Sequence, residues 1–476
     1  MAYTGFIVKV EHLRKHTNAD RLQIATFFGN DTIVGLDTKV GDMGVYFPTD
    51  GQLSEEFCRV NDLVRRKDEN GNQCGGYLDP EKRNIKALKL RGEKSDGLYL
   101  PIVSLSNFTK ISDLKVGDTI DILNGQEICR KYIPVSHERN HGGANHVKQA
   151  KKNFAPTFYE HIDTKQLAYN YAAFKAGDEV QLTLKMHGTS GRTGYLPLIR
   201  EVPRTFLDKL LRRTRTKTEY GYVTGTRRVV LDATHTGGFY EDNSFRQAMA
   251  AKFEGKLHKG EVVYYEIVGF QGPNGAPIMA SVANSKIKDK EFTKQYGAQT
   301  VFAYGCDASH GYNDEVPCCD IYVYRMTMVN EDGDVVEYSP DQIKMRCEQM
   351  GVKVVPEFAR FYLPDHVQGL HFEMNPVDPA EYLIRRVEEY FDGPDPVGKT
   401  HVREGVVVRI MNRTTFEAYK HKNFSFKVLE GIAKDEATAP DLEEAQEIID
   451  ESRLVSILRT FSTSRYSSRC PCLPSR

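Results

Sequence analysis

The chain has 476 residues, of which 27% are charged and 40% hydrophobic, as expected of a globular protein with two or three domains. Its 64 lysines and arginines nearly balance its 65 acidic residues, so the chain is no polycation, and any nucleic-acid contact must use local basic patches. No apolar run approaches the roughly 20 residues that cross a bilayer, the start lacks a secretory signal, and nine scattered cysteines indicate a reducing compartment. We expect a cytoplasmic protein without membrane contact, in the host cell if the chain is viral.

Residues 1–127 consist of short apolar runs separated by turns that contain glycine. Their alternating pattern predicts strands at 5–10, 22–28, 32–36, 44–48, 85–90 and 97–101. The polar stretch 61–82 predicts a long loop. Many short strands without a long helical pattern favour a small β-barrel.

Residues 128–155 form a basic, glycine-containing segment, either a solvated linker or a strap beside a nucleic-acid groove. From 156 to 435 strands and helices mix, which predicts an α+β domain. The expected strands are 180–184, 223–231, 262–270, 300–304, 321–328, 405–410 and 424–429; the expected helices are 206–213, 243–253, 340–350 and 379–391. Residues 436–476 are first acidic and then rich in arginine and serine, which predicts a disordered tail.

Lys185 stands at the end of an alternating run, in Leu184-Lys185-Met186-His187-Gly188-Thr189-Ser190-Gly191-Arg192. A lysine between a strand and a glycine turn can direct its amine into a cleft, where a desolvated amine can act as a nucleophile. A surface lysine at a strand end is the ordinary alternative. The residues downstream decide between the two.

Two carboxylates interrupt apolar strands further along the chain. Glu266 lies inside the run 262–270, and a buried carboxylate needs a partner because burial of an unpaired charge is costly. Glu404 begins the strand Glu404-Gly405-Val406-Val407-Val408 and could bind a metal, since carboxylates suit Mg²⁺ or Mn²⁺.

Basic residues complete the pattern. Lys420 and Lys422 are two positions apart, so in an extended strand they share one face and place two cations at one point. Such a pair would bind phosphate, and its charge would favour the neutral, nucleophilic form of Lys185. Arg227, in Thr224-Gly225-Thr226-Arg227-Arg228, adds a donor at the start of another predicted strand.

A structural zinc site at Cys306, His310, Cys318 and Cys319 is the weaker reading of the cysteine-rich stretch, because adjacent cysteines are poor chelators. Walker A and kinase glycine-loop patterns are absent from the sequence, which disfavours a P-loop enzyme or a kinase. A lysine nucleophile, carboxylates for a metal and lysines for phosphate together describe attack on the α-phosphate of a nucleoside triphosphate, with a lysyl-nucleotide as product.

The order of these motifs resembles the covalent nucleotidyltransferase superfamily of ligases and capping enzymes. His187, where most members carry aspartate, is typical of the RNA-ligase branch that includes the second phage-type RNA ligase family. Residues 16–22 and 89–98 resemble the N-terminal OB domain of Naegleria-type RNA ligases. The resemblance covers about residues 1–435 and implies an α+β chain: an N-terminal OB-fold barrel, then a ligase-type nucleotidyltransferase domain of antiparallel sheets with flanking helices.

The resemblance also implies roles for the reacting groups. Lys185 would carry AMP, while Lys420 and Lys422 would hold the α-phosphate. Glu404 would serve the catalytic Mg²⁺ or Mn²⁺, and Asp20 could reach a second metal, although a turn role suits Asp20 as well.

For the nucleotide, the resemblance implies contacts from Arg192 and Glu266 to the ribose, with Arg227 and His187 in the same binding set. Tyr324 is the expected aromatic that stacks on adenine, with Tyr304 as the alternative. Leu184 replaces a glutamate that contacts adenine in the phage-type relatives, so ATP is expected from the family alone.

The resemblance therefore predicts a monomeric, ATP-dependent RNA ligase that joins 3′-OH and 5′-phosphate RNA ends, in a nicked duplex or bridged by a template, in RNA repair. The alternatives are a DNA ligase, an mRNA guanylyltransferase, or a non-catalytic RNA-binding protein with an OB domain. The expected domains are 1–127 (OB fold), 128–155 (basic linker), 156–435 (nucleotidyltransferase) and 436–476 (tail).

Overall fold

The computed structural model describes residues 3–67, 73–90, 93–132, 154–203, 216–231, 240, 242–287, 289–368 and 374–430. The expected helix at 206–213, the tail at 436–476 and most of the basic linker lie outside the described residues. Within the described ranges, no helix has both the length and the apolar character needed to cross a membrane.

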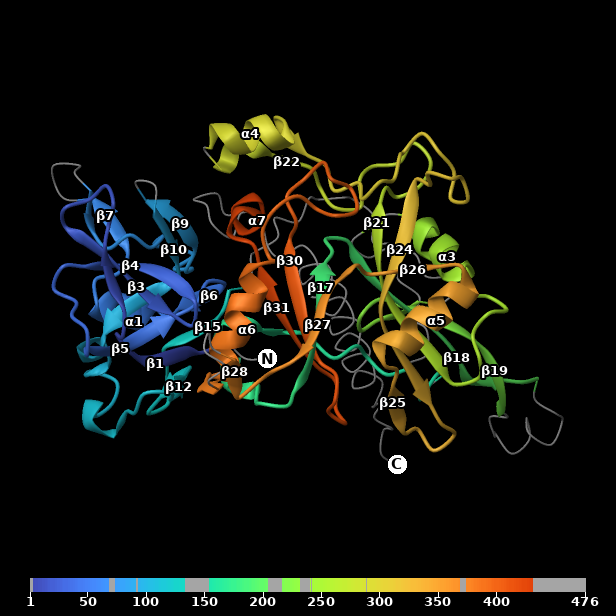
Figure 1. Cartoon of the computed structure of the whole chain (residues 1–476), viewed down its shortest axis with the longest axis horizontal. Helices are drawn as coiled ribbons and strands as arrows, with labels where there is room; N and C mark the ends of the chain where they lie inside the picture. Colours follow the sequence, from blue (N-terminus) through green and yellow to red (C-terminus); the bar gives the residue numbers. More distant parts are fainter. Residues whose placement is uncertain are drawn as a thin grey trace, which may run out of the picture.

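The N-terminal domain is built from short antiparallel strands (Figure 1, blue). One sheet has the order β11-β5-β1-β12 and a second the order β2-β3-β4. The strands of these two sheets are β1 (Gly5–Lys9), β2 (Leu13–Lys15), β3 (Leu22–Phe27), β4 (Asn30–Gly35), β5 (Met43–Phe47), β11 (Leu98–Pro101) and β12 (Thr119–Ile120). Alternate residues of β1 enter two cores, since Ile7 packs with Val45 and Phe47, whereas Phe6 and Val8 pack in a separate cluster.

Shorter pairs complete this domain. They are β6 (Gly51–Leu53) with β15 (Cys129–Lys131), β7 (Arg65–Lys67) with β8 (Gln73–Gly75), β9 (Ala87–Leu90) with β10 (Glu93–Asp96), and β13 (Ile122–Leu123) with β14 (Gln126–Glu127). Helix α1 (Glu55–Val60) begins at Ser54, whose side chain accepts from the Phe57 N–H. β15 follows the expected domain limit at residue 127 and pairs with β6, and the expected loop at 61–82 contains β7 and β8.

Two larger sheets are the main elements of the chain after the N-terminal domain (Figure 1, centre and right). The five-stranded sheet has the order β16-β31-β30-β17-β27, with β16 (Lys165–Gln166), β17 (Glu179–Lys185), β27 (Glu357–Tyr362), β30 (Gly405–Ile410) and β31 (Glu417–Lys422). The second sheet has the order β20-β19-β18-β21-β24-β25, with β26 on β24; its strands are β18 (Thr189–Glu201), β19 (Thr216–Gly225), β20 (Val230–Leu231), β21 (Glu261–Gly269), β24 (Cys319–Val329), β25 (Val335–Glu337) and β26 (Lys353–Val354). The remaining pairs are β22 (Val282–Ala283) with β23 (Gln299–Thr300) and β28 (His366–Gln368) with β29 (Met374–Pro376).

Helices flank these sheets: α3 (Ser244–Ala251), α4 (Lys290–Tyr296), α5 (Pro340–Met350), α6 (Pro379–Glu388) and α7 (Phe424–Leu429). Phe245 and Met249 of α3 and Ile343 of α5 enter the largest core with residues of β21 and β24. Ser339 begins α5 with a capping box, in which its side chain and that of Gln342 exchange hydrogen bonds with backbone N–H groups. The expected helices at 243–253, 340–350 and 379–391 are confirmed, apart from a few residues at their ends.

Three expected strands are wrong. The one at 223–231 is divided, because β19 ends at Gly225 and β20 begins at Val230. Residues 424–429 form α7 instead, because Asn423 caps the segment by accepting hydrogen bonds from the N–H groups of Ser425 and Phe426. Of the expected strand at 300–304, only Thr300 belongs to β23. The expected strands at 180–184, 262–270, 321–328 and 405–410 are confirmed.

Helix α7 stands between the N-terminal domain and the five-stranded sheet (Figure 1). Lys427 of α7 pairs with Asp96 of β10 at 2.5 Å, and Lys94 lies 5.0 Å from the ring centre of Phe424. These contacts join the two domains beside the end of β31.

Candidate active site

Lys185 is the last residue of β17, and the sheet register aligns it with the two motifs that follow far along the chain. In the pairing of β17 with β30, Lys185 lies opposite Gly405, and in the pairing of β30 with β31, Gly405 lies opposite Lys422. A line across three strands therefore brings Lys185, Glu404 and Lys422 to one end of the sheet.

Position 405 has to be glycine for this line to form. Gly405 has a φ of +151°, and a Cβ atom there would lie 2.0 Å from the carbonyl oxygen of His421. The bare backbone lets β30 approach β31 at the residue directly after Glu404.

The aligned side chains form a buried ion-pair cluster. Oε1 of Glu404 lies 3.0 Å from Nζ of Lys185 and 3.2 Å from Nζ of Lys422. Glu404 is fully buried, and Lys185 and Lys422 are 8% and 5% exposed. Such burial is tolerated because opposite charges meet at hydrogen-bonding distance.

Glu430 joins the cluster and was not expected from the sequence. Both of its carboxylate oxygens lie 3.0 Å from Nζ of Lys422. Its position follows from α7, which turns the chain back after β31 so that residue 430 faces residue 422. The expectation of a strand at 424–429 concealed this contact, although the Asn423 cap was a signal that could have revealed the helix.

His187 lies on the other side of the two carboxylates. Its Nδ1 is 3.7 Å from an oxygen of Glu404 and 3.7 Å from an oxygen of Glu430. The ring makes edge contacts with Phe302 at 4.6 Å and Phe426 at 4.9 Å. Its backbone N–H donates to the Tyr304 hydroxyl at 2.7 Å, which fixes the turn after Lys185.

His187, Glu404 and Glu430 can also serve as metal ligands. One ligand atom from each lies within 4.8 Å of the other two, and all three residues are buried. Two carboxylates and an imidazole fit Mn²⁺, and the carboxylates fit Mg²⁺. Within the described ranges, this is the only group of three or more such side chains, and it contains none of Cys306, His310, Cys318 and Cys319.

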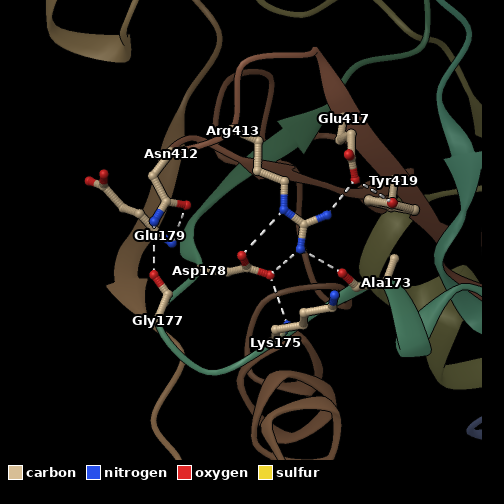
Figure 2. A network of polar contacts seen from close by, with 9 residues as sticks. All are labelled: Ala173, Lys175, Gly177, Asp178, Glu179, Asn412, Arg413, Glu417 and Tyr419. Carbon is tan, nitrogen blue, oxygen red and sulfur yellow. Dashed lines mark hydrogen bonds and ion pairs between the residues drawn. The ribbon is translucent and has the colours of Figure 1, made fainter.

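The opposite end of the sheet is held by a polar network around Arg413, in the turn between β30 and β31 (Figure 2). Arg413 donates to Asp178 at 2.6 Å, to the Ala173 carbonyl at 2.7 Å and to Glu417 at 2.8 Å. Asn412 accepts from the Glu179 N–H at 2.9 Å. The network ties the β30–β31 turn to the start of β17 and so holds the register on which the Lys185–Gly405–Lys422 line depends.

A cavity of about 620 Å³ opens beside the cluster, between the two larger sheets. Of the residues expected to bind nucleotide or react, it is lined by Lys185, Arg227, Glu266, Tyr324 and Lys420. The volume suits a nucleotide-sized ligand. Tyr304 does not line the cavity and accepts from the His187 N–H instead, whereas Tyr324 is part of the cavity lining.

Glu266 enters the cavity from β21, opposite Ser190 of β18. A Cβ at Gly188 would lie 2.3 Å from the Ile267 carbonyl oxygen and 2.9 Å from Cγ of Glu266. The absence of a side chain at Gly188 therefore lets the turn after Lys185 pack directly against the strand that carries Glu266.

Two expected site residues lie elsewhere. The Arg192 guanidinium donates to the carbonyls of Phe158, Tyr159 and Arg228 and does not line the cavity. Asp20 is exposed in the turn before β3 and belongs neither to the ion-pair cluster nor to the cavity lining. The ribose and second-metal roles of these residues stay predictions.

Residues 178–429 of the chain match the model of a protein family that is described as RNA ligase. No match was found among curated proteins. Among solved structures, a lysine-to-alanine variant of the Naegleria gruberi RNA ligase with ATP and Mn is 15% identical with a TM-score of 0.51, over 89% of this chain and 98% of that chain. An aspartate-to-alanine variant of the same ligase, without ligand, is 16% identical with a TM-score of 0.51, over 90% and 98%. This likeness confirms the expected fold, an OB-type barrel followed by a ligase-type domain.

Proposed function

The chain belongs to the RNA ligase family, and from that premise we propose that it seals RNA ends with ATP through AMP held covalently on Lys185. The observation that carries the proposal is the line of Lys185, Glu404 and Lys422, in which Lys185 lines the cavity and its two partners lie behind it in the buried cluster. The line joins a nucleophile, a carboxylate and a phosphate-binding cation from three segments of the sequence.

In the first step, Nζ of Lys185 gives up a proton to the solvent, and its lone pair then attacks the α-phosphorus of ATP. The P–N bond forms, the bond to the β-phosphate oxygen breaks, and pyrophosphate leaves with the electron pair. Lys420, which lines the cavity, and Lys422 next to it supply positive charge for the α-phosphate oxygens. Glu404 holds the Lys185 amine in place until the nucleotide enters.

In the second step, a 5′-phosphate oxygen of the RNA attacks the phosphorus of the lysyl-AMP, the P–N bond breaks and Lys185 regains a proton. In the third, the 3′-OH oxygen attacks the 5′-phosphate, loses its proton and releases AMP. Both steps reuse the lysines that surround Lys185 to offset phosphate charge.

The nucleotide is proposed to lie with its base against Tyr324, its ribose toward Glu266 and its phosphates toward Arg227 and Lys420. A divalent ion, when bound by the carboxylates of Glu404 and Glu430 and by His187, supplies positive charge that lowers the barrier to phosphoryl transfer.

The finer parts of the proposal concern the RNA and the setting. We propose 3′-OH and 5′-phosphate ends, in a nicked duplex or bridged by a template, a monomeric enzyme and a role in RNA repair in the cytoplasm. The free, buried thiols of the described cysteines suit a reducing compartment.

Denaturing gels of the protein incubated with α-labelled ATP or GTP and Mg²⁺ or Mn²⁺ test the first step. We expect an acid-labile AMP adduct that is lost in Lys185→Ala. Failure of either nucleotide to label the protein would contradict the enzyme proposal, and a GMP adduct would point to a capping enzyme. Sealing assays on nicked RNA, nicked DNA and open single strands then distinguish the substrates.

A further inference from the structure

His161 is a cavity residue that the proposed chemistry leaves without a role. It lies in the segment before β16, is 8% exposed and lines the same cavity as Lys185 and Tyr324. Its ring contacts Tyr324 at 5.2 Å and Tyr264 at 5.3 Å, so it stands directly beside the proposed base-stacking aromatic.

The hydrogen bonds of His161 fix which ring nitrogen carries the proton. Nδ1 lies 3.1 Å from Nη1 of Arg325. A guanidinium only donates, so Nδ1 must accept and the proton of a neutral ring must sit on Nε2. Burial and the positive charge of Arg325 and Arg227 hold the pKa of His161 well below its ordinary value, which keeps the ring neutral near pH 7.

The backbone around His161 is held as firmly as its ring. The His161 N–H donates to the Arg227 carbonyl at 3.1 Å, and Asp163 pairs with Arg228 at 2.8 Å. Arg192 donates to the carbonyls of Phe158 and Tyr159. The Arg192 side chain thus positions the segment that carries His161.

These contacts leave the Nε2–H of His161, a residue of the cavity lining, as a donor. Across the described ranges, no residue forms a hydrogen bond with Nε2, whereas Nδ1 is engaged by Arg325. A donor held in one orientation in a buried site discriminates strongly, because a ligand without a matching acceptor leaves it unpaired.

We infer that His161 is a specificity-determining residue, whose Nε2–H donates to an acceptor nitrogen of the adenine ring in the cavity beside Tyr324. The inference rests on the proposed function and deepens it. It supplies a base contact in a chain where Leu184 cannot form a polar one. The contact is to the base rather than to the ribose because the His161 ring lies against Tyr324.

The test compares formation of the Lys185 adduct with ATP, 1-deaza-, 3-deaza-, 7-deaza- and 2′-deoxy-ATP. The full-length protein, His161→Phe and His161→Gln are measured under single-turnover conditions. Phenylalanine keeps the aromatic contacts and removes the donor, whereas glutamine restores a donor near Nε2. His161→Met is a second donor-free variant if the phenylalanine variant does not fold.

We expect one deaza analogue to react about tenfold less efficiently than ATP with the wild type, the size of one hydrogen bond. Compared with the wild type, His161→Phe should form the adduct about tenfold less efficiently with ATP but almost equally well with that analogue, because the analogue already lacks the acceptor. His161→Gln should recover part of the efficiency with ATP. A packing role alone would not remove the deaza penalty.

The inference is overturned if the deaza penalties are the same in wild type and His161→Phe, or if His161→Phe abolishes the 2′-deoxy penalty instead, which would place the contact at the ribose. Failure of the wild type to form any adduct with ATP would overturn the proposed function itself, and the same gel separates that result from the others.

Discussion

The Lys185 ammonium and the Glu404 carboxylate lie 3.0 Å apart, and the same Glu404 oxygen is 3.2 Å from Lys422. One buried oxygen therefore fixes both the nucleophile and a phosphate-binding cation. Removal of a charged partner from such a cluster leaves the remaining charges uncompensated.

The first prediction is that Glu404→Gln loses adduct formation by about 100-fold or more, since one oxygen orients two reacting groups. The free energy of unfolding should also fall by about 3 kcal/mol. Adduct rates and urea unfolding measure the two effects. Glu430→Gln is the matched control, because it leaves the Lys185–Glu404 pair intact and should retain a measurable adduct. Equal activity of Glu404→Gln and wild type would contradict the assignment.

The second prediction concerns Tyr304, whose hydroxyl accepts from the His187 N–H. Tyr304→Phe should leave this buried N–H unpaired, lower stability by about 1–3 kcal/mol and slow adduct formation by loosening the turn after Lys185. Tyr338→Phe is the control, because the Tyr338 hydroxyl binds Glu261 away from the cluster. We expect it to lower stability without slowing the adduct. A normal adduct rate in Tyr304→Phe would argue against the positioning role.

The third prediction tests the contact between the two domains. Asp96→Asn, Lys427→Gln and the double variant form a cycle around a pair in which both side chains are largely buried. We expect a coupling of about 1 kcal/mol in unfolding free energy, because each single change leaves the other charge without its partner. Additive effects of the two changes would show that the pair does not join the domains.

The fourth prediction is a pH dependence centred on His421. Burial and the nearby charge of Lys427 lower the pKa of His421 to about 4. Between the ordinary histidine value of about 6.5 and pH 4, the unfolded chain binds a proton that the folded chain does not, so stability falls as the pH falls.

His421→Gln should reduce the dependence of the unfolding free energy on pH between about pH 6.5 and 4, because up to one bound proton no longer distinguishes the unfolded chain from the folded chain. Urea unfolding at several pH values measures this dependence. A change that merely weakens packing lowers stability equally at every pH and leaves the slope intact. An unchanged slope would therefore contradict the assignment.

Strand periodicity and spacing indicated that Lys185, Glu404 and Lys422 belong to one site, whereas the ion pairs that Glu404 forms with the two lysines were not expected. Lys185, Glu404 and Lys422 each end or begin an apolar run, and an antiparallel sheet brings such ends together. The two-residue spacing of Lys420 and Lys422 predicted a shared face, and both lie in strand β31, where Lys420 lines the cavity and Lys422 belongs to the buried cluster.

The sequence could not reveal contacts that depend on how segments turn back. Residues 424–429 alternate phenylalanine with polar residues as a strand would, and only the Asn423 cap favours the helix that returns Glu430 to Lys422. The sequence likewise contained no sign that the Arg192 guanidinium donates to backbone carbonyls of a segment more than thirty positions earlier. The hydrogen-bond partners of a long side chain depend on which distant segments lie beside it in the fold, and the periodicity of the sequence does not predict this.

Gly405 limits the amino-acid substitutions that the active site tolerates. Since any Cβ at this position would meet the His421 carbonyl, every substitution pushes β30 away from β31, and Glu404 then shifts relative to both lysines at once. In a library randomised at 405 and at the neighbouring strand position 407, selection for sealing should return only glycine at 405 while accepting several apolar residues at 407. A position with no side chain would thus be less replaceable than most of the side chains that line the cavity.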